Sequence, residues 1–139
     1  MCNDEGVRED ELLDADFSDS DKPKDECGVF GVWAPGEEVS RLTYFGLYAL
    51  QHRGQQSAGI AASDGKSIMV YKDMGLVSQV FNDEALSTLE GHLAIGHVRY
   101  ATKAAAEWKH SQPMLGPTAT GSIALGNNGN VTNATQLRD

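Results

Sequence analysis

The stretch that decides the fold is Cys27-Gly28-Val29-Phe30-Gly31-Val32-Trp33-Ala34, in which glycines are interspersed with valine, phenylalanine and tryptophan. Pro35-Gly36 ends this run abruptly. Eight mainly apolar residues closed by turn residues are typical of a buried β-strand. We therefore expect residues 27–34 to form a strand at the start of the ordered part of the chain.

The segment before this run, residues 1–26, has a different character. It contains eleven acidic and three basic residues, so it carries −8 of the formal net charge of −9. The whole-chain charge argues against nucleic acid and anionic membrane surfaces as partners, although residues 27–139 are nearly neutral. With few apolar side chains, the segment is expected to be disordered or weakly helical. Two interpretations stay open on composition: a solvating tail, or a propeptide removed between Glu26 and Cys27.

Removal of the segment would change the chemistry of Cys27. The residue would then carry both a thiol, with a pKa near ~8.5, and a free α-amine, with a pKa near ~7.7–8.0. These groups can exchange a proton at neutral pH, so one residue would supply a nucleophile and its base. On its own, Cys-Gly is weak support for this role, because most cysteines are small buried apolar residues.

The remaining patterns predict a mixture of helices and antiparallel strands, an α+β fold. Helical periodicity, alternation and turn residues give the following elements: a helix over Glu37–Gln51, hairpin strands Ser57–Ala62 and Ile68–Lys72 around Asp64-Gly65, a short helix over Glu84–Glu90, strands His92–Tyr100 and Ser122–Gly126, and a helix beginning at Asn133. This last helix would stop at Asp139 after barely two turns, so we expect the sequence to be partial.

Two polar segments carry candidate chemistry. Residues 51–59, Gln-His-Arg-Gly-Gln-Gln-Ser-Ala-Gly, form either a surface loop or a functional loop. Arg99 ends an apolar strand in Gly96-His97-Val98-Arg99-Tyr100-Ala101-Thr102. A guanidinium there is expensive to bury unpaired, so it serves a structural ion pair or binds an incoming carboxylate. His97 is expected to be a satisfied core histidine rather than a catalyst.

The segment Asn127-Asn128-Gly129-Asn130 also has two interpretations. Asn-Gly is the standard signal for a type I′ hairpin turn, which is its commoner meaning. The alternative is an oxyanion hole, built from the Asn128 side-chain amide and the Gly129 backbone N–H. Two such donors would stabilise the tetrahedral intermediate of acyl transfer.

Taken together and in order, Cys-Gly-Val-Phe-Gly, Gln-His-Arg-Gly-Gln, Gly-His-Val-Arg-Tyr-Ala-Thr and Asn-Gly-Asn resemble the class II glutamine amidotransferase domain. The resemblance covers essentially all of residues 27–139. The motif sequences are most similar to those of the branch that transfers ammonia to phosphoribosylpyrophosphate (PRPP) in the first step of purine synthesis. Leader-bearing members of that branch carry Glu-Cys-Gly-Val-Phe-Gly at the cleavage point, which matches residues 26–31 and favours the propeptide interpretation.

The resemblance implies a four-layer α/β/β/α sandwich of the Ntn-hydrolase type, with antiparallel sheets. It implies an enzyme in which the free amine of Cys27 takes the thiol proton and the sulfur attacks the carboxamide of glutamine. The other implied residues are the oxyanion donors Asn128 and Gly129, the substrate-binding Arg99, Tyr100 and Thr102, and the supporting Arg53 and Gly54.

Some features depart from the family or lie beyond this sequence. The family commonly has histidine at the position of Asn127. Its acidic residue for the substrate α-amine and its phosphoribosyltransferase domain, which uses PRPP and Mg²⁺, would lie beyond Asp139. No cofactor or metal is expected within residues 1–139, although leader-bearing members often hold a 4Fe–4S cluster through cysteines elsewhere. As a full-length protein, the enzyme is expected to be a homo-oligomer.

Cysteine count and hydropathy bound the location of the protein. Cys2 and Cys27 cannot form a disulfide framework, and no Cys/His spacing of the zinc type is present. No signal peptide or span of ~18 apolar residues occurs, so we expect a cytoplasmic protein with no membrane partner.

Two other functions stay open. One is another class II glutamine amidotransferase, of the glucosamine 6-phosphate or glutamate synthase type. The other is a non-catalytic domain that keeps the fold as a binding module. In that case the leader would be retained. The backbone nitrogen of Cys27 would then be an amide, which cannot act as the base for the thiol.

Overall fold

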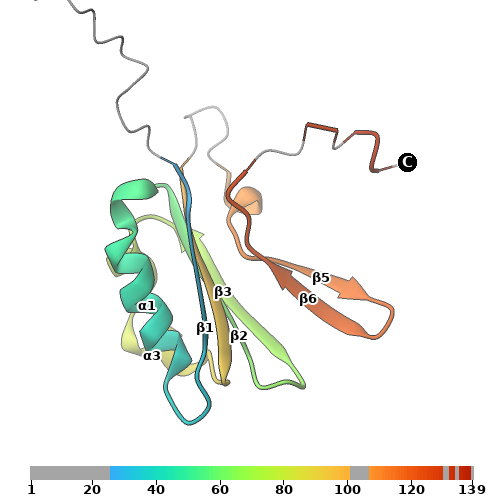
Figure 1. Ribbon diagram of the computed structural model, residues 1–139. Coiled ribbons are helices and arrows are strands. Elements are labelled where there is room, and N and C mark those ends of the chain that lie inside the picture. Colours follow the sequence, from blue (N-terminus) through green and yellow to red (C-terminus); the bar gives the residue numbers. More distant parts are fainter. Residues whose placement is uncertain (1–25, 101–106, 130–131, 134, 139) are drawn as a thin grey trace, which may run out of the picture.

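The computed structural model describes residues 26–100, 107–129, 132–133 and 135–138 (Figure 1). Its centre is a four-stranded antiparallel sheet in the order β1-β4-β2-β3. The strands are β1 (Gly28–Trp33), β2 (Ser57–Ser63), β3 (Ile68–Met74) and β4 (Leu93–Arg99). In this arrangement the start of β1 lies beside the end of β4, with Gly28 paired to Val98. The thiol-bearing end of the first strand is thus next to the arginine that ends the fourth.

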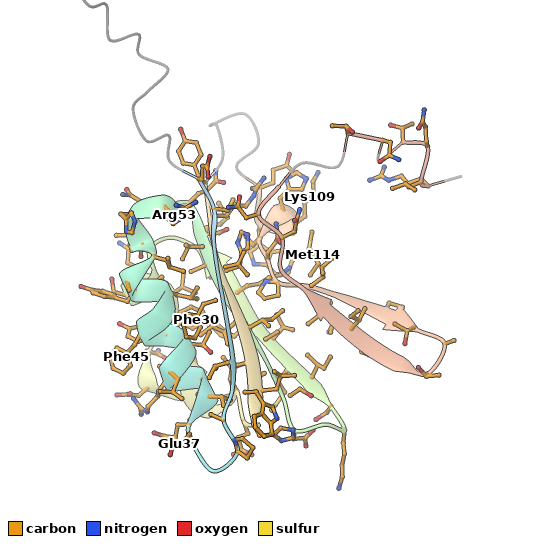
Figure 2. The ribbon with its side chains drawn as sticks, viewed as in Figure 1. Phe30, Glu37, Phe45, Arg53, Lys109 and Met114 are labelled. Carbon is orange, nitrogen blue, oxygen red and sulfur yellow. The ribbon has the colours of Figure 1, made fainter. Side chains whose placement is uncertain are left out.

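Helices cover one face of this sheet, with α1 (Val39–Ala49) the longest, followed by the short α2 (Val77–Val80) and α3 (Asp83–Ser87). α1 turns one side towards the strands and buries Val39, Thr43 and Leu47, which are spaced by four residues. Leu47 packs with residues of the central strands such as Ile60 and Val98. Figure 2 shows Phe30 of β1 between the sheet and α1, whereas Phe45 points away from the sheet. The hydrophobic core therefore lies between the helices and the sheet.

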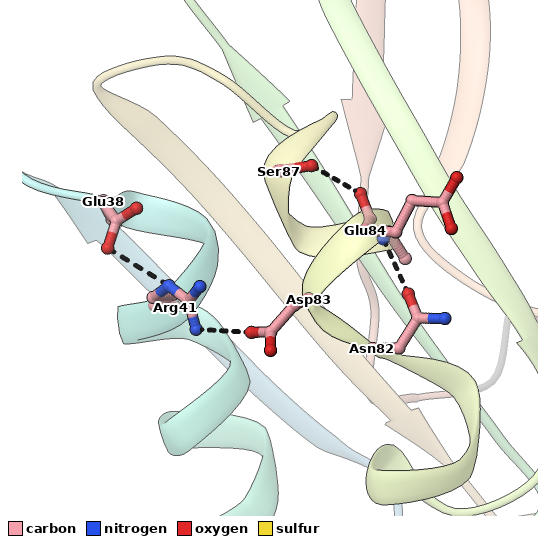
Figure 3. A network of polar contacts seen from close by, with 7 residues as sticks. Glu38, Arg41, Asn82, Asp83, Glu84 and Ser87 are labelled. Carbon is pink, nitrogen blue, oxygen red and sulfur yellow. Dashed lines mark hydrogen bonds and ion pairs between the residues drawn. The ribbon is translucent and has the colours of Figure 1, made fainter.

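Polar contacts join α1 to α3 at the edge of this core (Figure 3). Arg41 pairs with Asp83 at 2.9 Å and with Glu38 at 3.1 Å. The Asn82 side chain caps α3 by accepting a hydrogen bond of 2.8 Å from the Ala85 N–H. The Arg41–Asp83 pair joins α3 to the N-terminal half of α1, at the end of the sheet away from Cys27.

A second, two-stranded sheet lies towards the other face of the main sheet and consists of β5 (Met114–Thr118) and β6 (Gly121–Leu125) (Figure 1). A cleft between the sheets is lined by Ala61 and Ile95 on one side and by Ile123 on the other. The described residues thus contain a helical layer, a sheet, and a hairpin beyond that sheet. The predicted α+β class with antiparallel sheets is confirmed.

The predicted elements match the structure with shifts of one or two residues at nearly every end, but α3 ends at Ser87 rather than Glu90, and α2 was not predicted. α1 begins at Val39, so Glu37 and Glu38 precede it and no acid occupies its first turn. β5 was not predicted. At the predicted C-terminal helix, the described residues form turns, in which the Asn133 carbonyl accepts hydrogen bonds from the Gln136 and Leu137 N–H groups. Residues 1–25 of the proposed leader, residues 1–26, lie outside the described residues.

No helix in the described part of the chain is long and apolar enough to cross a membrane.

Candidate functional site

Cys27 lies immediately before β1, beside the residue that follows β4. Its side chain is partly buried, and its Sγ lies 3.7 Å from the carbonyl oxygen of Tyr100. The Arg53 Nε donates a hydrogen bond of 3.2 Å to the Cys27 carbonyl oxygen. The same guanidinium pairs with the Glu26 carboxylate at 3.1 Å. Figure 2 shows Arg53 at the end of α1, next to the start of β1. Arg53 therefore contacts the residues on both sides of the proposed cleavage point.

Arg53 reaches this position because the chain after α1 turns tightly. Residues Gln51–Arg53 form a single 3₁₀ turn, and the Gln51 side chain links it to the following Gly54 and to the start of α2. Its amide nitrogen donates to the Gly54 carbonyl oxygen at 2.6 Å, and its amide oxygen accepts from the Val77 N–H at 2.6 Å. The Gln-His-Arg-Gly segment is thus an anchored loop.

Gly54 lets this loop approach the sheet closely. A Cβ built at Gly54 would lie 2.7 Å from the Arg99 carbonyl carbon and 2.8 Å from the Val98 carbonyl carbon. Side chains do not tolerate backbone contacts this short, so only glycine fits here. The close approach places the 3₁₀ turn against the end of β4.

Arg99 ends β4 on the same side of the molecule. Its guanidinium donates a hydrogen bond of 3.2 Å to the Gln56 Oε1, and its carbonyl oxygen accepts from the Gln56 N–H at 3.0 Å. Tyr100 follows and is 46% exposed. The structure thus gathers Cys27, Arg53 and Arg99 at one end of the sheet. Thr102 lies outside the described residues.

Asn127, Asn128 and Gly129 follow β6 as an exposed, irregular segment. Neither Asn128 nor Gly129 has a positive φ, so the type I′ turn considered for Asn-Gly is wrong. The Asn127 Nδ2 donates a hydrogen bond of 3.3 Å to the Gly129 carbonyl oxygen. A Cβ on the preceding Gly126 would lie 3.8 Å from the Val29 side chain. The segment therefore leaves the second sheet next to β1, two residues along from Cys27.

His97 is fully buried in β4, as predicted, but the prediction of a satisfied histidine holds for Nε2 only, because the buried Nδ1 has no hydrogen-bond partner among the described residues. Its Nε2 lies 3.0 Å from the Asn127 carbonyl oxygen. Because a carbonyl oxygen only accepts, Nε2 must carry the proton. Burial lowers the pKa of His97; the hydrogen bond to Asn127 opposes this shift, and the nearby Arg99 charge adds to it.

Sequence patterns missed the contributions of Gln51 and Gln56, although both lie in the singled-out loop. Composition marked the loop as rich in amides, but it could not say which amide meets which partner, since Val77 and Arg99 are distant in sequence. Among the described residues, no group of three or more His, Cys, Asp or Glu side chains could hold a metal ion.

Comparisons with known proteins give consistent relatives. The chain is 58% identical over 120 residues to the amidophosphoribosyltransferase of Mycobacterium tuberculosis (strain ATCC 25618 / H37Rv). The aligned residues cover 86% of this chain and 23% of that protein. It is 50% identical over 115 residues to the amidophosphoribosyltransferase of Bacillus subtilis (strain 168), covering 82% of this chain and 24% of the relative. The chain thus spans about a quarter of the length of these curated relatives. No family model matches it.

Solved structures agree with this. A structure of glutamine PRPP amidotransferase from B. subtilis complexed with ADP and GMP matches with a TM-score of 0.70 and 49% identity, over 79% of this chain and 23% of that chain. A structure described as the allosteric regulatory enzyme of purine biosynthesis matches with a TM-score of 0.73 and 49% identity, over 79% of this chain and 24% of that chain.

Proposed function

We propose, from the premise that this chain belongs to the amidophosphoribosyltransferase family, that residues 27–139 are part of a domain that hydrolyses glutamine and supplies ammonia to PRPP. The product would be 5-phosphoribosylamine, in the first step of purine synthesis. The observation that carries this proposal is the position of Cys27 at the end of the sheet. Its carbonyl oxygen accepts a hydrogen bond from Arg53, and Arg99 lies nearby at the end of β4.

Removal of residues 1–26 precedes catalysis and frees the α-amine of Cys27. This amine accepts the thiol proton, directly or through water, and the sulfur attacks the side-chain carbonyl carbon of glutamine. A C–S bond forms, and the carbonyl oxygen becomes an oxyanion. The Asn128 amide and the Gly129 N–H donate hydrogen bonds to this oxyanion.

Collapse of the intermediate releases ammonia and leaves a γ-glutamyl thioester on Cys27. The proton on the leaving nitrogen comes from the Cys27 ammonium. Water then attacks the thioester, the C–S bond breaks, and glutamate is released. Arg99 binds the substrate α-carboxylate, and Tyr100 and Thr102 shape the pocket. Arg53 and Gly54 support the nucleophile.

Transfer of the released ammonia requires a site that binds PRPP. In this proposal, residues outside this sequence bind PRPP and Mg²⁺ and contact the substrate α-amine. The homo-oligomeric state and the cytoplasmic location are part of the same proposal.

A direct test compares glutamine hydrolysis by the purified full-length protein and its Cys27→Ser variant. The proposal predicts equal amounts of glutamate and ammonia from the natural protein, and loss of both from Cys27→Ser. Unchanged hydrolysis by Cys27→Ser would refute it. Hydrolysis that is absent from both proteins would favour the non-catalytic domain.

A further inference from the structure

Asn127 directly precedes the two proposed oxyanion donors, and side chains from distant parts of the chain hold both polar groups of its backbone. Its N–H donates to the Gln112 Oε1 at 2.7 Å. Its carbonyl oxygen accepts from the His97 Nε2 at 3.0 Å. Its own side chain bonds the Gly129 carbonyl oxygen at 3.3 Å. Asn127 is thus fixed at both ends of its backbone and in turn restrains Gly129.

His97, which bonds the Asn127 carbonyl oxygen, is held firmly within the sheet. His97 lies in the middle of β4, paired with Val29 on one side and Gly59 on the other, and it is completely buried. Its Nδ1 has no hydrogen-bond partner in the described part of the chain. The bond to Asn127 is therefore the one side-chain hydrogen bond that the ring makes among the described residues, and the buried Nδ1 makes none. A buried donor aimed at an exposed segment fixes that segment relative to the sheet.

Gln112, which accepts from the Asn127 N–H, is fixed through its backbone. The Lys72 Nζ, on β3, donates to the Ser111 carbonyl oxygen at 2.6 Å and to the Pro113 carbonyl oxygen at 3.2 Å, on either side of Gln112. The Gln112 carbonyl oxygen lies against Gly59 so closely that any Cβ there would collide with it. Gln112 is thus held on the face of β2 and β3 before its side chain reaches Asn127.

We propose that His97 and Gln112 are positioning residues that set the geometry of the oxyanion donors through the backbone of Asn127. This inference rests on the proposed function, to which it adds two residues that orient the oxyanion donors for glutamine hydrolysis. Oxyanion stabilisation depends on donors that are already aimed before the charge develops. A displacement of ~1 Å at such a site can lower the rate ~100-fold. Because the contacts from His97 and Gln112 go to the backbone of Asn127, they do not depend on the side chain at position 127.

The primary test compares Gln112→Met with Gln112→Glu in the full-length protein. Methionine removes the acceptor for the Asn127 N–H at similar volume, whereas a carboxylate retains an acceptor. The expected result is a decrease in kcat for glutamine hydrolysis of about 10- to 100-fold in Gln112→Met, with KM within about twofold, and substantial recovery in Gln112→Glu.

A second readout separates positioning from general disruption. The aldehyde analogue of glutamine adds the Cys27 thiol to give a tetrahedral adduct that uses the oxyanion donors, whereas glutamate binds as a planar product. Gln112→Met is expected to lower the affinity for the aldehyde by the same factor as it lowers kcat, and to leave the affinity for glutamate unchanged. His97→Gln, which keeps an N–H near the position of Nε2, should retain more activity than His97→Leu.

The controls make the outcomes distinct. Asn82→Ala removes the cap of α3 and touches no part of this segment, so it reports the effect of lower stability alone. The inference is overturned if Gln112→Met leaves kcat and aldehyde affinity unchanged, or weakens aldehyde and glutamate equally. If His97→Leu does not fold, the Gln112 pair decides. A natural protein that hydrolyses no glutamine would refute the proposed function and the inference with it.

Discussion

The Arg53 guanidinium holds the Cys27 backbone: its Nε donates to the Cys27 carbonyl oxygen at 3.2 Å, while its Nη2 contacts the Glu26 carboxylate at 3.1 Å. One side chain therefore fixes the nucleophile relative to the turn after α1. Removal of residues 1–26 would take away the Glu26 contact and leave the contact to Cys27. Arg53 is consequently placed to act both before and after processing.

Replacing Arg53 tests this role. Arg53→Met is expected to lower kcat for glutamine hydrolysis about 10-fold or more, because the nucleophile loses the contact that orients its backbone. Arg53→Lys should recover little, since an ammonium does not reproduce the planar donor fork. Steady-state kinetics on the processed protein measure both. Arg41→Met, which loses a surface ion pair between α1 and α3, is the control. Equal rates for Arg53→Met and the natural protein would contradict the role.

Gly54→Ala tests the close approach of the turn to β4. The new Cβ would lie within 2.8 Å of the Val98 and Arg99 backbone, so one of the two segments must move. We expect a loss of about 1–3 kcal/mol in the free energy of unfolding, together with lower activity. Gly116→Ala is the matched control, because a Cβ there meets nothing within 4 Å. A Gly54→Ala variant as stable as Gly116→Ala in urea unfolding would show that the contact is unimportant.

The sequence predicted the sheet and the large helix well, because Val, Ile and Leu periodicity and the turn at Asp64-Gly65 are local signals. It missed β5, since Met114-Leu115-Gly116-Pro117-Thr118 contains glycine and proline and lacks a clear alternation. It also placed Glu37 and Glu38 within α1. The sequence therefore predicts local structure where apolar spacing is regular and fails where the pairing with β6 decides.

The candidate site was predicted by motif order rather than by physics. Nothing local in Asn128-Gly129 distinguishes an oxyanion segment from a hairpin turn, and the hairpin meaning proved wrong. The holding contacts of Asn127 come from residues 15 and 30 positions away. Such contacts exist only after the two sheets are formed, so no sequence window could contain them.

His97 predicts a pH dependence of stability. Burial lowers its pKa below the usual 6.5 in the folded protein. The unfolded state therefore binds the proton more readily, so the stabilisation is fully present above the unfolded pKa and is lost as pH falls through the folded pKa. The natural protein should lose stability relative to His97→Gln as pH falls below about 6.5. Urea unfolding of both proteins across this range measures the difference. A constant difference at all pH values would exclude His97 as the group responsible.

Lys72 predicts an effect on the attachment of the second sheet. Burial lowers the pKa of its ammonium, which donates to two carbonyl oxygens and lies 5.4 Å from the centre of the Trp108 ring. Lys72→Met is expected to cost about 1–3 kcal/mol in the free energy of unfolding, because charged hydrogen bonds to residues 111 and 113 are lost. Lys109→Met removes only an exposed ion pair with Glu107 and should change little. Similar stabilities for the two variants in chemical unfolding would count against the Lys72 contacts.

The central claim is that Cys27 becomes the N-terminal nucleophile of a glutamine-hydrolysing site. The most direct measurement is the intact mass of the protein purified from its own cells, with and without an alkylating glutamine analogue. We predict a chain that begins at Cys27 and gains one adduct on that residue. A folded chain that still begins at Met1 and gains no adduct would contradict the account.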